Sequence, residues 1–303
     1  MRKSVVSLMV MLLFVATLMS NLVYAYVLIP ESGTYVSLPG SPSEPIVTEI
    51  SGVKFYDSNA NGKRDEGEAG MGGWTILLYK WMPDDEGNWG WVELAYINTD
   101  DGGGYIFKVS EGIYKVVELM QEGATPLEKW VQTAPSEGCH VIEAEELGGS
   151  YDAWDLGNVY LKPANGGKTM GFWGNKNGQA LIDSEDVMEL NNLNLYRPAG
   201  WAYPPFTDKA EIKNYLRNAT AVDMRWMLSA QLIATKLNVL HGFLINSTIV
   251  YVESSGTFIT IGEIMDNAYM ALQGTNTDAQ EYWKNLLDWV NNNWLPFVIP
   301  NPP

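Results

Sequence analysis

The spacing of apolar residues changes once along this chain, and this change constrains the fold more than any other feature. Between residues 49 and 162, apolar side chains recur at every second position in short runs separated by turns rich in Gly, Asn and Asp. Alternation with period two is typical of strands with one buried face. The pattern favours an antiparallel, Ig-like β-sandwich. Strands are predicted at 50–56, 74–81, 91–98, 104–109, 113–119, 129–133, 140–143 and 156–161.

From residue 169 onward the apolar spacing becomes helical, which predicts a second, mainly α-helical domain. Apolar residues surround most of the segment 222–240, which therefore belongs at the centre of a bundle. Asp208 with Glu211, and Thr277 with Gln280, have the spacing of capping boxes. A small hairpin is predicted from 249–253 and 257–261 around a Ser-Ser-Gly turn. Helices are predicted at 179–190, 209–218, 222–240, 261–272 and 278–292.

The N-terminus has the layout of a signal peptide, predicted to occupy residues 1–25. Arg2 and Lys3 precede an apolar run at 5–18, and Ala25 lies at a cleavage position. An uncleaved membrane anchor is the alternative, because 19–25 is also fairly apolar. No later segment is apolar enough to span a bilayer, so the mature chain is expected to be secreted or at the cell surface without a transmembrane span.

Three segments follow the predicted signal peptide. Residues 26–48 contain Pro, Ser and Gly and two short apolar patches, which is typical of an extended leader or linker. A strand that pairs with a neighbouring subunit is the alternative for this segment. The β-sandwich is assigned to 49–162 and the helical module, of unknown function, to 163–303.

The charge is strongly negative and unevenly divided. The whole chain has a net charge of -17, and the segment 49–162 holds 21 acidic and 8 basic residues. Such a surface repels phosphate backbones, which argues against nucleic acid as a partner. Divalent cations are the more natural counterpart.

One turn of the predicted sandwich has the complete pattern of a calcium-binding loop. Residues 57–68 read DSNANGKRDEGE, with a glycine at position 6 for the sharp turn. Hard oxygen ligands on alternate residues, closed by a longer bidentate carboxylate, suit Ca²⁺. Strands flank the loop, so the helix opening of an EF-hand is not expected. The predicted ligands are Asp57, Asn59, Asn61, the carbonyl of Lys63, Asp65 and Glu68.

A possible second calcium site follows from strand direction. If successive strands alternate, the turns that carry Asp100, Asp101 and Glu122 lie at the same end of the sandwich as Asp57. A second cation would relieve the repulsion among these carboxylates. Solvated turn carboxylates are the alternative interpretation.

The segment 50–160 resembles the SdrD B-like repeats of surface adhesins, which are related to the collagen-adhesin B-type domain. The resemblance runs through ISGVKFYDSNANGKRDEGEAGMGGWTILLY, TDDGGGYIFKVSEGIYKVVE, KWVQTAP and DLGNVYL. It implies a prealbumin-like sandwich stiffened by calcium, used as a stalk or spacer in cell-surface proteins, with no catalytic activity. Some relatives form a Lys–Asn isopeptide cross-link with the help of an acidic residue.

Lys54, Glu118 and Asn158 are the residues that would form such a cross-link in this chain. However, Val53 and Phe55 are the apolar positions around Lys54, and alternation then places Lys54 on the outer face. The cross-link is therefore not expected from the sequence.

The segment 169–292 resembles a second, poorly characterised module of secreted prokaryotic proteins. The phrases TMGFWGNKNGQALI, RNATAVDMRWMLSAQLIATKLNVLHGF and TIGEIMDNAYMAL carry this resemblance. Trp173, Asn175, Asn177 and Gln179 combine an aromatic face with short amides, which suits sugar binding. A turn anchored by a buried Trp is the alternative. Asn218 and Asn246 begin N-glycosylation sequons.

The sequence favours no enzyme. It contains no GxSxG, HExxH, P-loop or dinucleotide motif, and its two histidines, His140 and His241, have no zinc-type spacing. Cys139 is the only cysteine, which indicates a buried thiol or pairing between molecules.

We therefore expect a non-catalytic cell-surface structural or adhesive protein whose sandwich is rigidified by calcium. The alternatives are a secreted carbohydrate-binding accessory protein that uses the C-terminal module and, with least support, a hydrolase. The expected partners are cell-surface or extracellular-matrix components, a second copy of the chain, or glycans.

Overall fold

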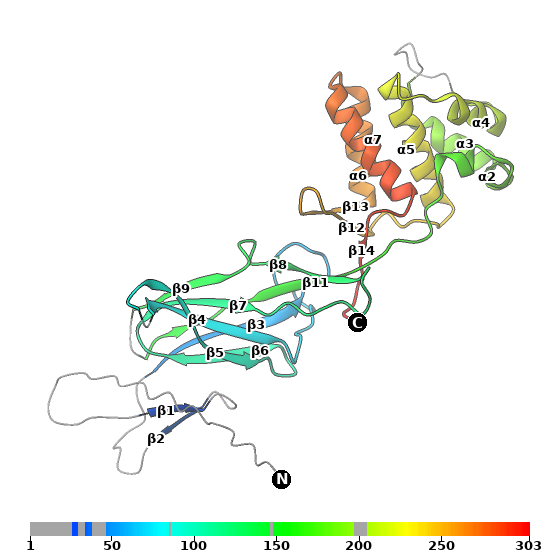
Figure 1. Cartoon of the computed structure of the whole chain (residues 1–303). Helices are drawn as coiled ribbons and strands as arrows, with labels where there is room; N and C mark the ends of the chain where they lie inside the picture. The colour runs from blue at the N-terminus through cyan, green and yellow to red at the C-terminus, as the bar shows by residue number, and fades with distance from the viewer. Residues whose placement is uncertain (1–25, 30–33, 38–46, 85, 146–147, 197–204) are drawn as a thin grey trace, which may run out of the picture. The chain divides into compact units, whose positions relative to one another are not determined.

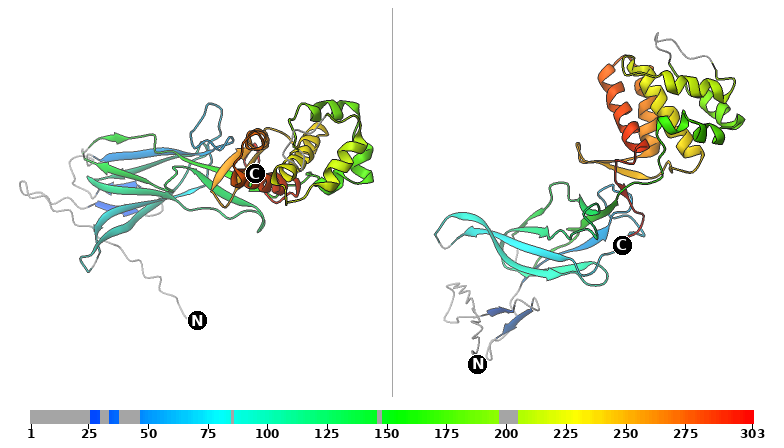
Figure 2. Two further views of the ribbon diagram at one scale, coloured as in Figure 1. Left: turned by 90° about the horizontal axis from the view of Figure 1, so that it is seen from above. Right: turned by 45° about the vertical axis from the view of Figure 1, so that its right-hand side comes forward.

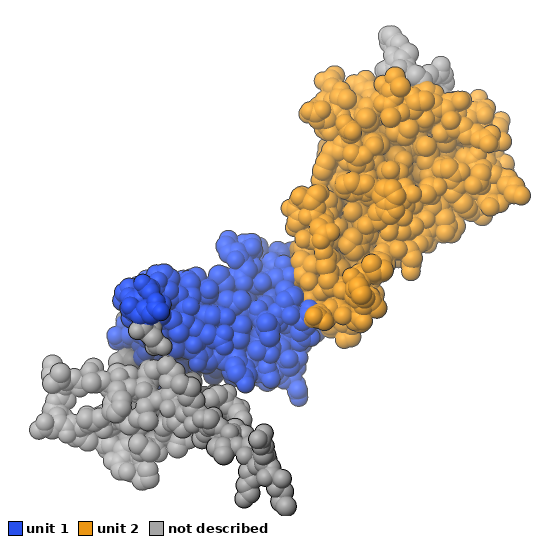
Figure 3. Space-filling view, in the orientation of Figure 1, with its two compact units in different colours: residues 1–57, 61–121, 132–158 blue, residues 58–60, 122–131, 159–303 orange. Residues whose placement is uncertain are grey.

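The computed structural model describes residues 26–29, 34–37, 47–84, 86–145, 148–196 and 205–303. The predicted signal peptide, 1–25, lies outside these residues. The chain divides into two compact units, shown in blue and orange in Figure 3. The first unit comprises residues 1–57, 61–121 and 132–158, and the second comprises 58–60, 122–131 and 159–303.

In the segment expected to be an extended leader, two short strands pair with each other. β1 (Tyr26–Ile29) and β2 (Thr34–Ser37) are antiparallel, with Tyr26 opposite Ser37. These strands coincide with the two apolar patches of the sequence.

All eight predicted strands of the sandwich are present, and their ends differ from the predicted ends by two residues at most (Figure 1). The short strand β10 was not predicted. The strands are β3 (Thr48–Tyr56), β4 (Thr75–Pro83), β5 (Trp89–Asn98), β6 (Gly104–Val109), β7 (Gly112–Glu118), β8 (Lys129–Ala134), β9 (His140–Ala144), β10 (Ser150–Tyr151) and β11 (Leu156–Lys162).

The sandwich of the first unit is built from two sheets. One has the strand order β5-β4-β7-β9 and is antiparallel throughout. In the other, β3 pairs antiparallel with β6 and parallel with both β10 and β11. The predicted β-sandwich is therefore confirmed, but the expectation of purely antiparallel pairing is wrong for β3. Side chains buried between the sheets include Ile50, Ile76, Leu78, Phe107, Val116 and Ile142.

A close backbone approach brings the turn after β5 against the segment that follows the predicted calcium loop. An added Cβ at Gly70 would lie 1.8 Å from the carbonyl oxygen of Gly102, so only glycine fits at this position. The turn itself contains Gly103 with a φ of +81°, a conformation that favours glycine. The turn with Asp100 and the calcium loop thus lie at the same end of the sandwich, as predicted from strand direction.

The second unit is mainly helical. Figure 2 shows that its helices pack on one another, with the predicted hairpin of β12 and β13 at one end. The helices are α1 (Met170–Trp173), α2 (Lys176–Leu181), α3 (Ser184–Asn191), α4 (Lys209–Asn218), α5 (Met224–Leu240), α6 (Ile261–Gln273) and α7 (Thr277–Asn291). The strands are β12 (Ile249–Val252), β13 (Thr257–Thr260) and β14 (Phe297–Val298).

Helix α5 lies at the centre of the bundle, as its apolar pattern predicted. Its residues from Leu228 to Ala234 are all buried. Its buried polar side chains are hydrogen-bonded to α7, since Thr235 Oγ1 donates to Asn291 Oδ1 and Asn238 Nδ2 donates to the same oxygen. None of the helices in the described segments has both the length and the apolarity needed to cross a membrane.

Local capping explains where the helices differ from the prediction. The predicted helix 179–190 is two helices, because α2 ends with the extended residue Ile182 as its C-cap, and Asp183 caps α3 through the backbone N–H groups of Glu185 and Asp186. The predicted capping box at Thr277 is wrong, because Asn276 caps α7.

Asp208 caps α4 as predicted. The reciprocal half of this box is absent, because Glu211 accepts a hydrogen bond from the backbone N–H of Thr207 instead of Asp208.

Candidate functional site

Lys54 lies in the core of the sandwich, which corrects the prediction that it faces outward. Its exposed fraction is 0%. Along β3 the core side is marked by Ile50, Lys54 and Tyr56, whereas Val53 is only half-buried. Phe55 is also buried, because it packs over Gly157 of the neighbouring strand, where a Cβ would meet its ring at 2.5 Å. Both faces of β3 are covered at this point. The apolar residues Val53 and Phe55 therefore did not show that Lys54, on the opposite face, is exposed.

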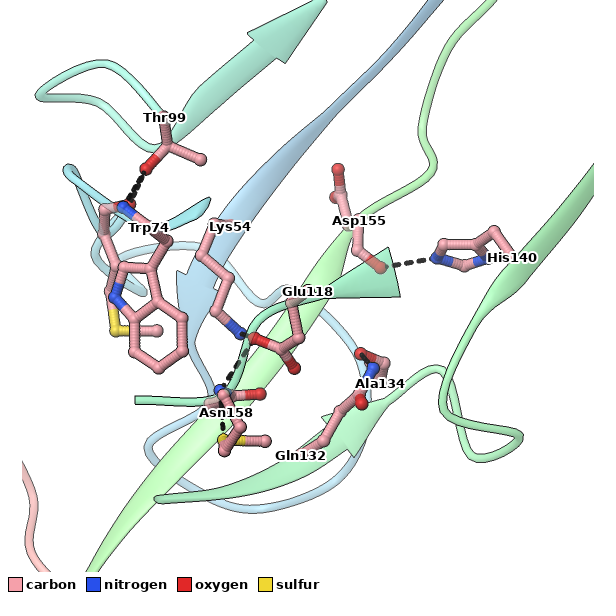
Figure 4. A network of polar contacts seen from close by, with 11 residues as sticks. Lys54, Trp74, Thr99, Glu118, Gln132, Ala134, His140, Asp155 and Asn158 are labelled. Atoms are coloured by element: carbon pink, nitrogen blue, oxygen red, sulfur yellow. Dashed lines mark hydrogen bonds and ion pairs between the residues drawn. The ribbon is translucent and has the colours of Figure 1, made fainter. Parts of the chain in front are cut away.

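Lys54 and two further polar side chains, each from a different strand, form a buried cluster (Figure 4). Glu118, the last residue of β7, places Oε2 2.7 Å from Lys54 Nζ. Asn158 of β11 donates from Nδ2 to the same carboxylate oxygen at 2.9 Å. Because β3 and β11 are parallel neighbours, with Lys54 opposite Leu156, the lysine and asparagine side chains rise toward Glu118 from adjacent strands.

The surroundings of this cluster exclude water and fix the side chains. The Lys54 ammonium lies 4.6 Å from the centre of the Trp74 ring, which adds a cation–π contact. Met120 Sδ lies 3.6 Å from Asn158 Nδ2. Within the described residues, Glu118 Oε1 and Asn158 Oδ1 are buried without a hydrogen-bond partner, whereas Lys54 Nζ has its ion pair with Glu118 Oε2. Such unsatisfied buried groups are costly, so a fold that retains them calls for an explanation.

Burial shifts the titration of both charged groups toward their neutral forms. It lowers the pKa of Lys54 to about 8, against the opposing attraction of Glu118. Burial also raises the pKa of Glu118, against the opposing effects of Lys54 and the Asn158 amide. Burial therefore makes the neutral amine of Lys54 and the protonated acid of Glu118 easier to reach than they are for exposed side chains.

These three groups supply the parts of an amide-forming reaction. The neutral Lys54 amine is a nucleophile, the Asn158 side chain carries the electrophilic carbonyl carbon Cγ, and Glu118 is positioned to move protons between them. Attack by Nζ forms a new C–N bond. Breakage of the Cγ–Nδ2 bond then releases ammonia, which takes the proton that the amine loses. The product is a neutral amide between Lys54 and Asn158, and no oxidant or cofactor is consumed.

The predicted calcium loop is compactly turned, and its first residue is fixed by the backbone. Asp57 is fully buried, and its two carboxylate oxygens accept from the backbone N–H groups of Asn61 and Gly62. Gly62 has a φ of +74°, which agrees with the glycine expected at position 6. The loop backbone therefore curls around the buried carboxylate of Asp57.

The later loop ligands bond to one another. Asn61 Nδ2 donates to Asp65 Oδ2 at 2.8 Å, and the backbone N–H of Asp65 donates to Glu68 Oε2 at 3.1 Å. Asn59 belongs to a stretch, Ser58–Ala60, that is grouped with the second unit. The donor set of carboxylates, amides and a carbonyl is of the kind that Ca²⁺ prefers, so the residues fit the ion chemically.

The residues of the possible second calcium site are not brought together. Asp100 accepts from the backbone N–H groups of Gly102 and Gly104, and Asp101 is exposed on the same turn. Glu122 forms an isolated bridge with Lys129 and belongs to the second unit. Across the described part of the chain, no group of three or more His, Cys, Asp or Glu side chains is close enough to hold a metal ion.

The residues predicted to bind sugar are used inside the helical unit, which corrects that prediction. Trp173 is completely buried and donates from Nε1 to Asn238 Oδ1. Asn175 caps α2, and Gln179 donates to the carbonyl of Trp173. Asn177 lies in the first turn of α2. The aromatic face is therefore not available to a ligand, and the alternative interpretation, a turn anchored by a buried Trp, is the correct one.

The remaining single residues occupy separate places. Asn218 and Asn246, the sequon asparagines, are both exposed. Cys139 is half-buried in the turn before β9. His140 and His241 lie in different units, and His241 Nε2 is 2.9 Å from Asp186 Oδ2.

No family model and no curated protein matches this chain. Membership of the SdrD B-like family therefore stays a prediction.

Solved structures with partial likeness include Gram-positive pilins. They are the shaft pilin SpaA from Lactobacillus rhamnosus GG (10% identity, 37% of this chain and 50% of that chain, TM-score 0.25), the minor pilin GBS52 from Streptococcus agalactiae (11%, 45% and 60%, TM-score 0.24) and a streptococcal ancillary pilin (11%, 52% and 48%, TM-score 0.26). The chain spans between about half and three fifths of these proteins. At such low identities and TM-scores, the likeness carries no argument about function.

Proposed function

We propose that this protein is a non-catalytic structural protein of the cell surface, whose β-sandwich is locked by an amide bond between Lys54 and Asn158. The observation that carries the proposal is the fully buried Lys54, 2.7 Å from a carboxylate that also holds the Asn158 amide. A buried ion pair is weak evidence for stability by itself, because desolvation of the charges offsets their attraction. Conversion of the ammonium to a neutral amide removes the desolvation cost of the ammonium, and loss of its charge favours the protonated, neutral form of Glu118, whose pKa burial raises.

The position of the bond suits a protein that resists tension. β3 begins the sandwich at Thr48, and β11 leaves the first unit at Asn158. A bond between Lys54 and Asn158 joins these first and last strands. Force applied to the two ends of the unit would then pass through a covalent bond, and the strands between residues 54 and 158 would carry none of it. This is the mechanical property that a stalk or spacer needs.

Intact mass spectrometry under denaturing conditions tests the proposal. We expect a mass about 17 Da below that calculated for the same chain, because one ammonia molecule leaves when the amide forms. A branched proteolytic peptide that contains both Lys54 and Asn158 identifies the bond. A chain of full calculated mass, with two separate peptides, would refute the cross-link.

We propose further that Ca²⁺ rigidifies the sandwich through the loop 57–68. The chemistry of the donor set and the inward carboxylate of Asp57 support this proposal. Substitution of Asp57 would remove two backbone hydrogen bonds even without metal, so Glu68 is the better residue to change. Glu66, exposed in the same loop at a position that supplies no ligand, provides a matched control.

We expect Ca²⁺ to raise the melting temperature of the wild-type protein and of Glu66→Gln, and to leave that of Glu68→Gln nearly unchanged. At a calcium concentration 100 times the Kd, the stabilisation is about 2.7 kcal/mol, or on the order of 10 °C for a domain of this size. Calorimetry of each protein in excess calcium and in chelator measures the difference in melting temperature. Equal melting temperatures in both conditions for the wild-type protein would rule out the calcium proposal.

A further inference from the structure

The outer face of the sheet β5-β4-β7-β9 carries a group of aromatic side chains that the core does not use. β4 and β5 pair with Tyr79 opposite Glu93, Trp81 opposite Trp91, and Pro83 opposite Trp89. Ile76 and Leu78 of β4 point into the core, so their neighbours along the strand lie on the opposite face. The outer aromatic face, as we name it, consists of Tyr79, Trp81, Trp89, Trp91 and Tyr96.

Three of these aromatic side chains are exposed, and Tyr79 and Trp91 are half-buried. Trp89 is 64% exposed, Tyr96 49% and Trp81 38%. From Trp89 to Tyr96 the face extends roughly 20 Å along β5, by the usual rise of an antiparallel strand. Exposed aromatic groups of this extent on one sheet face are typical of an interaction site.

Contacts within the outer aromatic face hold several of the rings in fixed positions. The Trp81 and Trp91 rings meet edge to face with centres 5.4 Å apart. Lys115 of β7 lies over both Tyr79 (4.7 Å) and Trp91 (5.0 Å). Ordered rings lose little conformational entropy when a ligand stacks on them.

Polar groups lie beside the rings. The Tyr79 hydroxyl donates to Glu93 Oε2 at 3.3 Å, and Glu93 is exposed. Lys115 supplies a cationic hydrogen-bond donor. It lies opposite Tyr79 on β7, whereas Glu93 lies opposite Tyr79 on β5. The face thus combines apolar ring surfaces with hydrogen-bond donors and acceptors at their edges.

We propose that the outer aromatic face binds a neutral polysaccharide. Pyranose rings present apolar C–H faces that stack on aromatic rings, and hydroxyl edges that hydrogen-bond with groups such as Glu93 and Lys115. Charge selects this occupant over others. The segment 49–162 has 21 acidic and 8 basic residues, so a second copy of the chain or an anionic polymer is repelled, whereas a neutral glycan is not.

Retention of the full chain on insoluble cellulose and chitin, with titration of soluble cellohexaose and chitohexaose followed by tryptophan fluorescence, tests this proposal. We expect binding by the wild-type protein and at least about tenfold weaker binding by Trp89→Ala and by Tyr96→Ala. Trp294→Ala is the matched control, because Trp294 is 65% exposed and lies in the second unit. This control should bind like the wild-type protein, and circular dichroism should show all variants folded.

Three results would overturn the proposal. The first is no retention on either polysaccharide and no binding of either oligosaccharide by the wild-type protein. The second is equal loss of binding in Trp89→Ala and Trp294→Ala. The third is a concentration-dependent dimer, seen in sedimentation velocity, that Trp89→Ala abolishes, because this would identify a second copy as the occupant.

Discussion

Glu118→Gln is expected to leave the chain at the full mass calculated for that variant, without the loss of about 17 Da that the cross-link causes in the wild-type protein. Glutamine can retain a hydrogen bond to Asn158, but its amide neither accepts nor releases a proton. It therefore cannot take the proton from the Lys54 amine or pass it to the leaving ammonia. Near-complete loss of the bond is the largest chemical effect that a single substitution in this protein should produce. Intact mass spectrometry measures both species in one spectrum.

Glu143→Gln is the control for this substitution. Glu143 is on β9, the strand next to β7, and its side chain is exposed. This variant should show a mass about 17 Da below that calculated for its own sequence, as the wild-type protein does. If Glu118→Gln forms the bond as completely and as fast as the wild-type protein, Glu118 has no role in the reaction, and the assignment of the proton transfer to this residue is wrong.

The double variant Lys54→Met with Glu118→Gln is expected to melt roughly 20 °C below the wild-type protein. A bond between residues 54 and 158 closes a loop of about 100 residues, for which chain entropy gives about 4.7 kcal/mol. For a domain near this size each kcal/mol corresponds to about 4–8 °C. Because the double variant leaves no charged side chain in the cluster of Lys54, Glu118 and Asn158, the loss of stability reports the missing bond and not an unpaired ion at this place.

The opposite result is expected if Lys54 and Glu118 form only an ion pair. Replacement of a buried ion pair by uncharged side chains of similar size is often neutral or stabilising. An unchanged or higher melting temperature for the double variant would therefore contradict the cross-link. Lys108→Met with Glu49→Gln is the control, since this exposed pair, 3.8 Å apart, also joins β3 to a neighbour and should matter by about 1 kcal/mol or less.

The strands and most helices were predictable because local periodicity decides them. The strands at 104–109 and the helix at 209–218 have the predicted ends. The hairpin of β12 and β13 also follows its turn sequence. Helix ends were less predictable where two capping side chains compete, as Asn276 and Thr277 do at the start of α7.

The candidate site could be predicted only in part. The sequence indicated Lys54, Glu118 and Asn158 as a set, but a strand's period of two gives two faces and does not say which is buried. The core side chains Ile50 and Tyr56 share the parity of Lys54, and this would have been the informative signal in β3. The parallel pairing of β3 with β11, which brings Lys54 near Asn158, joins residues about a hundred positions apart and has no local signature.

Exposure of the aromatic residues likewise needed the tertiary structure. Trp173 and Trp89 are each followed directly by a glycine in the sequence, yet Trp173 is completely buried and Trp89 is 64% exposed. A bulge between Leu78 and Tyr79 also shifts the register of β4 against β5, which helps to place Tyr79 opposite Glu93.

The sequence by itself determined the succession of a sandwich and a helical bundle, the acidic charge and the calcium-type loop, because each depends on residues that are close along the chain. The tertiary structure alone decided that Lys54 is buried beside Glu118 and Asn158, and that the free aromatic surface lies on β4 and β5 instead of at Trp173. Both depend on which faces of the strands and helices other elements cover. Such coverage arises from long-range packing, which local periodicity does not record.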